Sequence, residues 1–109
     1  MENLEKKLKV LGDSNRFKIV KLLLSHDLCV GALAQHLGIS KPAISQHLQV
    51  LRREGLVKGE KRGYWTHYVV EKDILKQIAD DLIDLTQQPF HDCADGYCDL
   101  IHEIREKPE

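Results

Sequence analysis

The sequence predicts one mainly α-helical domain that carries a single small antiparallel β-hairpin. Leucine, isoleucine and valine recur at intervals of three and four residues in five separate runs, and two short β-prone runs flank a basic segment bounded by glycines. The length of 109 residues, 42% hydrophobic and 30% charged, suits one hydrophobic core. We expect residues 1–88 to form this domain and residues 89–109 to form a cysteine-containing tail.

The N-terminal part predicts two amphipathic helices separated by Gly12. The first carries a stripe of three leucines: Leu4, Leu8 and Leu11. Asp13 or Ser14 can cap the second helix, because their side-chain oxygens accept hydrogen bonds from its first amides. This second helix is expected to bury the stripe Phe17, Val20, Leu23 and Leu24.

Two short helices joined by a tight turn come next. The first is expected over residues 30–37 and ends at Gly38, whose missing side chain suits the left-handed backbone after a helix. Ser40 can cap the second, and Pro42 is tolerated in a first turn whose amides lack helical partners. The buried face of this second helix is expected to consist of Ile44, Leu48 and Leu51. The pair is a helix-turn-helix candidate.

A hairpin and a last helix complete the domain. Residues 56–58 and 64–70 are β-prone and flank residues 59–63, so we expect a hairpin whose tip carries Lys61 and Arg62. This hairpin is the wing of a winged helix-turn-helix. The last helix is expected over residues 73–86, before Pro89, with a stripe formed by Ile74, Ile78, Leu82 and Leu85.

Charge is divided unevenly along the chain, although the net charge is only −1. Residues 1–70 carry twelve Lys and Arg against six Asp and Glu, or +6, whereas residues 71–109 carry four against eleven, or −7. Phosphate contacts need locally clustered cations. We therefore expect double-stranded DNA to bind to the first 70 residues.

The second helix of the helix-turn-helix can read base edges in the major groove with the side chains that its apolar face leaves outside. The predicted DNA-binding residues are Ser40, Lys41, Ser45, Gln46, His47, Gln49, Lys61 and Arg62. Gln46 suits adenine, Ser45 suits several bases, and Lys41 suits phosphate or guanine. His47 could instead hydrogen-bond within the fold. The alternative for the two hairpin cations is an ordinary solvated turn.

The segments 28–34, 45–52, 54–57 and 62–65 together resemble the ArsR/SmtB family of metal-sensing repressors. The similarity covers roughly residues 3–85, and its order, spacing and residue types agree across the helices and the wing. It implies a homodimer built from the first and last helices, a palindromic operator, and release from DNA when an inducer binds. Two copies related by a twofold axis could read half-sites one helical turn apart.

The dimer interface is expected to use the apolar stripes near both ends of the domain. The candidates are Leu4, Leu8, Leu11, Ile78, Leu82 and Leu85. The alternative is that these side chains only complete the core of a single protomer.

Three cysteines in a chain without an export signal favour reactive or metal-binding thiols over structural disulfides. Cys29 opens the third helix, while Cys93 and Cys98 lie in the tail. Three thiolates suit a thiophilic inducer, arsenite foremost, then cadmium, lead or mercury. Zinc would prefer a fourth ligand, for which His91 or His102 is available. No organic cofactor is expected.

The resemblance is incomplete at the metal sites of the family. One family site is a Cys-Val-Cys sequence, and here Gly31 replaces the second cysteine, so that the missing donors would have to come from the tail. The other uses an Asp-x-His pair, and here Asp73 is followed by no histidine before His91. This second departure argues against a zinc, cobalt or nickel sensor of that type.

Other interpretations remain open at this point. Cys29 could be a small buried apolar residue, and the tail thiols could be incidental or form a redox or persulfide switch without metal. The domain could be a winged-helix module that binds only protein. No catalytic motif is present, so we do not expect an enzyme. No membrane association is expected, because no apolar run approaches the length that crosses a bilayer, and we expect the protein in the cytoplasm.

Overall fold

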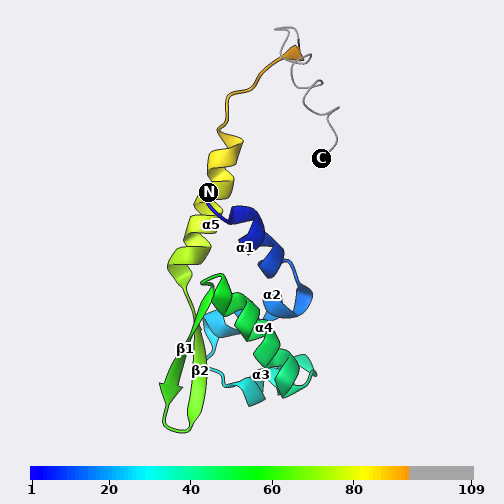
Figure 1. Ribbon diagram of the computed structural model, residues 1–109, viewed down its shortest axis with the longest axis vertical. Coiled ribbons are helices and arrows are strands. Elements are labelled where there is room, and N and C mark those ends of the chain that lie inside the picture. Colours follow the sequence, from blue (N-terminus) through cyan, green and yellow to red (C-terminus); the bar gives the residue numbers. More distant parts are fainter. Residues whose placement is uncertain (94–109) are drawn as a thin grey trace.

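The computed structural model describes residues 1–93 (Figure 1). Its helices and strands, in chain order, are α1 (Leu4–Leu11), α2 (Ser14–Ser25), α3 (Val30–Leu37), α4 (Lys41–Arg53), β1 (Val57–Arg62), β2 (Trp65–Val70) and α5 (Lys72–Thr86). Helices α3 and α4 pack against each other, and the antiparallel pair β1–β2 extends beside them as a wing. The predicted winged helix-turn-helix is therefore confirmed.

The helix ends follow the capping chemistry predicted from the sequence. Asp13 caps α2, with its Oδ1 accepting a hydrogen bond from the backbone N–H of Arg16 at 3.1 Å. Ser40 caps α4, with its Oγ accepting from the backbone N–H of Ala43 at 3.2 Å. Gly38 ends α3 with a φ of +69°, in the left-handed region that side chains disfavour. These three residues fix the turn between α3 and α4 and the entry into α2.

The core is centred on α4, whose apolar face is buried as predicted. Ile44, Leu48 and Leu51 are at most 1% exposed. They pack in one cluster with residues of α2, α3 and β1, among them Ile19 and Leu33, which are fully buried. The burial of one face of α4 leaves its opposite face to solvent, and this is what positions the candidate site.

Helix α2 differs from its predicted packing. Phe17 and Leu24 are 52% and 42% exposed, so their assignment to the buried stripe is wrong, and Ile19 takes that place together with Val20. The reason is that α2 is apolar on two sides, so that spacing alone does not identify the buried one. Phe17 lies instead under the ammonium group of Lys21, which is 5.9 Å from the ring centre.

The hairpin is longer and its turn tighter than predicted. The two strands pair as far as Arg62 opposite Trp65, which leaves Gly63 and Tyr64 as the turn. Gly63 has a φ of +63°, which two-residue hairpin turns that match the strand twist require. The predicted five-residue loop is therefore wrong, and Lys61 and Arg62 lie within β1.

Gly59 explains why the sequence was misleading here. A glycine usually marks a turn, but Gly59 lies inside β1 opposite Tyr68. A Cβ at this position would lie 3.4 Å from the Tyr68 ring atom Cε1 and 3.3 Å from Thr66 Cγ2. The missing side chain thus makes room for the tyrosine of β2.

Helix α5 leads away from the wing with α1 beside it (Figure 1). Leu4 and Ile78 are 9% and 6% exposed within the single protomer. Leu8, Leu82 and Leu85 are 37%, 40% and 47% exposed. Each of the apolar stripes of α1 and α5 is thus only partly buried within the protomer.

Within residues 1–93, no helix combines the length and apolar character that crossing a membrane requires.

Candidate nucleic-acid interface

The outward face of α4 is polar and open to solvent. Lys41, Ser45, Gln46 and Gln49 are exposed, and they lie across the helix from its buried apolar residues. Glutamine and serine side chains of this kind can donate to and accept from base edges, and an exposed lysine can contact phosphate. Because the buried face holds α4 in the core, this surface is rigid.

The start of α4 also lies close to the start of α3. A methyl group built on Gly31 would lie 3.6 Å from Cε of Lys41 and 3.9 Å from Sγ of Cys29. The Lys41 side chain therefore extends over the first turn of α3, near the thiol. Ser40 is exposed, and because its Oγ accepts the capping hydrogen bond, its hydroxyl hydrogen can still be donated to a phosphate.

His47 differs from the other predicted contacts on α4. It is half-buried, and its Nδ1 lies 3.5 Å from Nη1 of Arg16. Arg16 in turn donates from Nε to the carbonyl oxygen of Val10 at 2.7 Å. The pKa of Asp13 is lowered mainly by the hydrogen bond from the Arg16 amide, and the charges of Arg16 and His47 add to this. His47 thus contacts the junction of α1 and α2, which favours the interpretation of a bond within the fold.

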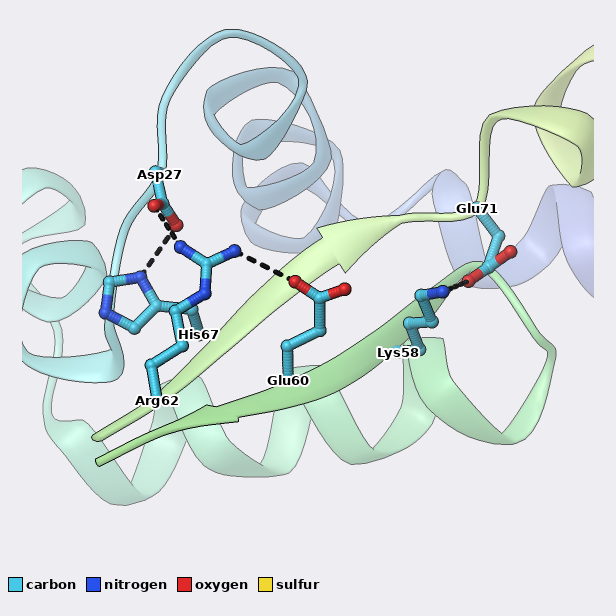
Figure 2. A network of polar contacts seen from close by, with 6 residues as sticks. All are labelled: Asp27, Lys58, Glu60, Arg62, His67 and Glu71. Atoms are coloured by element: carbon cyan, nitrogen blue, oxygen red, sulfur yellow. Dashed lines mark hydrogen bonds and ion pairs between the residues drawn. The ribbon is translucent and has the colours of Figure 1, made fainter. Parts of the chain in front are cut away.

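An ion-pair network lies on one face of the hairpin (Figure 2). The carboxylate of Asp27, in the loop between α2 and α3, contacts both strands of the wing. Its Oδ1 accepts from Nδ1 of His67 in β2 at 2.7 Å, and its Oδ2 accepts from Nη1 of Arg62 in β1. Nη2 of Arg62 donates to Oε1 of Glu60 at 2.9 Å. Arg62 is therefore paired with two carboxylates of its own protein.

The pKa values of this network reflect the pairing. The hydrogen bond from His67 is the main cause of the lowered pKa of Asp27, and Arg62 lowers it further. Glu60 and Asp27 together raise the pKa of Arg62. The Asp27 carboxylate therefore remains ionised in neutral solution.

Sequence reasoning missed this network. Asp27 is 35 residues from Arg62 and 40 from His67, and no local spacing connects them. Only the packing of α2 against β2 brings them together.

This architecture matches known regulators of transcription. The model for bacterial regulatory proteins of the arsR family matches residues 13–58, from the cap of α2 into β1. An HTH-type transcriptional regulator of Methanocaldococcus jannaschii is 38% identical over 82 residues, which are 72% of this chain and 92% of the relative. The chain belongs to the arsR family. Family membership also means that this protein is not an enzyme, as predicted.

Two further relatives of this arsR-family protein are connected with arsenic by name. The arsenical resistance operon repressor of Staphylococcus aureus is 36% identical over 75 residues, which are 69% of this chain and 72% of the relative. The crystal structure of a possible transcriptional regulator for arsenical resistance superposes with a TM-score of 0.66 and 31% identity, covering 94% of this chain and 97% of that chain. This chain therefore has the same fold as that regulator.

Cys29, the first predicted metal ligand of the arsR-family protein, is a free and half-buried thiol at the N-cap of α3. Its backbone forms an isolated antiparallel bridge with His67 of β2. The thiol therefore lies where the helix-turn-helix meets the wing, two residues after Asp27.

The other predicted ligands follow α5 in the chain or lie outside the described residues. Cys93 lies seven residues after the end of α5 and is disulfide-bonded. His91 also follows α5, whereas Cys98 and His102 lie outside the described residues. No cluster of three or more His, Cys, Asp or Glu side chains that could hold a metal ion is found in residues 1–93. Within these residues, one protomer therefore does not form a complete metal site around Cys29.

Proposed function

We propose that this protein is a homodimeric transcriptional repressor that binds a palindromic operator and is released by a thiophilic metal or metalloid. The observation that carries the DNA-binding part is the exposed polar face of α4, held rigid by a buried apolar face. The exposed Lys61 of the adjacent wing supplies a cation for the phosphate backbone.

Gln46 is the residue of α4 that we expect to carry the most sequence preference, because its amide can pair with adenine in two places. Gln46→Ala should therefore lower the preference for the operator over random duplex by about 1 to 3 kcal/mol, roughly 5- to 150-fold. The operator is obtained by selecting the best-bound duplex from a random pool, and both affinities are measured by fluorescence anisotropy.

Gln87→Ala, at an exposed position at the end of α5, is the matched control and should change neither affinity. Equal losses on operator and random duplex for Gln46→Ala would remove Gln46 from the base contacts. Failure of the unaltered protein to bind any duplex with salt-sensitive affinity would favour the alternative of a protein-binding module.

The dimer interface that we propose is narrower than the sequence predicted. Leu4 and Ile78 are buried within one protomer and need no partner. Leu8, Leu82 and Leu85 remain exposed. Ile83, which was not among the predicted interface residues, is 53% exposed beside Leu82 on α5. An apolar surface over α1 and α5 is a suitable core for a twofold interface.

The inducer that we propose is arsenite or an ion of similar thiophilicity. The names of two relatives support it, as does the free thiol of Cys29. The described residues of one protomer fit such an ion only in part, because they supply one free sulfur donor. The remaining donors would come from Cys93 and Cys98, with His91 or His102 as a further ligand, from the tail of either protomer. Because Cys93 is disulfide-bonded, it could act as a donor only after reduction of that bond, which a reducing cytoplasm would favour.

A second candidate inducer is an oxidant or persulfide, and one observation favours it. Cys93 is disulfide-bonded, so its sulfur can exist in an oxidised, sulfur–sulfur-bonded form. A switch of this kind would change the tail without metal. Both candidates leave the DNA-binding part of the proposal unchanged.

A further inference from the structure

The two neighbouring cations of the wing differ in what they can offer to DNA. Lys61 is exposed and, across residues 1–93, makes no ion pair. Arg62, the next residue, is directed at Asp27 and Glu60. Two carboxylates therefore face one guanidinium group, so the positive charge of Arg62 is already matched by negative charge beside it. In this arrangement Arg62 adds little to the positive potential that attracts phosphate.

The ion pairs of Arg62 are not needed to hold the wing in place. The hairpin is anchored by Val57 and Val70, which are 2% and 9% exposed, and by the hydrogen bond from the Glu71 amide to the carbonyl of Leu56 at 2.8 Å. The bridge between Cys29 and His67 is made by backbone atoms. In contrast, the side chains of Arg62 and Asp27 are 44% and 57% exposed. Exposed ion pairs add little to folding stability.

Asp27 is nevertheless held in one orientation. The hydrogen bond from His67 Nδ1 occupies its Oδ1 and turns its Oδ2 toward Arg62 (Figure 2). A carboxylate is a planar oxyanion and a phosphate is a tetrahedral one, and both accept hydrogen bonds from the same guanidinium donors. A DNA phosphate that approaches Arg62 must therefore displace Asp27 or meet its negative charge.

We propose that Asp27, with Glu60, is an internal competitor of DNA phosphate for Arg62 and thereby limits how tightly the wing holds DNA. This inference rests on the proposed DNA-binding function. It assigns a part in DNA binding to Asp27, which lies outside both the helix-turn-helix and the wing. The loop between α2 and α3 would thus reduce the contribution of the wing to duplex affinity.

The test is a double-mutant cycle on affinity for a mixed-sequence duplex of about 30 base pairs, long enough for two half-sites one helical turn apart. Asp27→Asn, which keeps the shape of the side chain, should tighten binding about two- to fivefold. In an Arg62→Ala background the same substitution should give no such gain. Glu60→Gln removes the other carboxylate charge beside Arg62 and should also tighten binding.

Glu71→Gln is the matched control, because Glu71 pairs with Lys58 on the same hairpin at 3.6 Å but does not contact Arg62. It should give less than about a twofold change, independent of Arg62. Weaker binding by Asp27→Asn, or a gain that persists in full without Arg62, would overturn the inference. If the unaltered protein bound no duplex, the proposed function itself would fail, whereas binding without a gain in either carboxylate variant would refute only the competition.

Discussion

Leu82→Asp is expected to convert the protein to a folded monomer that binds its operator at least about 100-fold more weakly. Leu82 is 40% exposed in the protomer and lies outside its core cluster, so the substitution should leave the fold of one chain intact. In the proposed dimer the aspartate would be buried without a partner, which costs several kcal/mol. One protomer can then read only one half-site, and the affinity falls accordingly.

The measurements are light scattering for the mass in solution, circular dichroism for the fold, and anisotropy for operator affinity. Gln87→Asp adds the same charge at the exposed C-cap that follows α5 and should remain dimeric. A Leu82→Asp protein that stays dimeric would show that α5 is not the interface. A protein that unfolds would show that Leu82 serves the protomer instead.

The second large effect concerns the inducer. Arsenite added to the reduced protein–operator complex should lower the DNA affinity about 5- to 150-fold, the range of ordinary allosteric coupling. Cys29→Ser should lose this response while binding operator normally without arsenite, because it removes the sulfur donor next to the helix-turn-helix. The double variant Cys93→Ser, Cys98→Ser should lose it too, if the tail supplies the other donors.

Each protein is titrated with arsenite, cadmium, lead, mercury, zinc and a polysulfide while operator binding is followed. His36→Ala, which alters an exposed histidine at the other end of α3, is the control and should respond like the unaltered protein. Release by an ion in every cysteine variant would contradict a thiol site. Release by polysulfide alone would establish the redox alternative.

The parts of the fold that were predictable share one physical property. The stripe of Ile44, Leu48 and Leu51 stands on a helix with a polar opposite face, so that its period alone identified the buried side. The caps at Asp13 and Ser40 were predictable because capping depends on a few adjacent residues. These local rules were enough to identify the helix-turn-helix and the exposed face of α4.

The rest depends on contacts between distant residues. Periodicity marks Leu4 and Leu8 alike, but only the packing of the protomer separates the buried leucine from the exposed one. The hydrogen bonds of Asp27 to two strands arise from tertiary proximity and have no sequence signal. For the same reason, spacing alone could not tell whether Cys29 and Cys93 meet.

Hydrogen exchange of the backbone amides, with and without operator duplex, tests the central proposal most directly. We expect added protection in residues 40–49 of the α4 region and in residues 59–66 of the hairpin, with α5 unchanged. Unchanged exchange in residues 40–49 while the duplex is demonstrably bound would contradict the assignment of α4 as the DNA-reading helix.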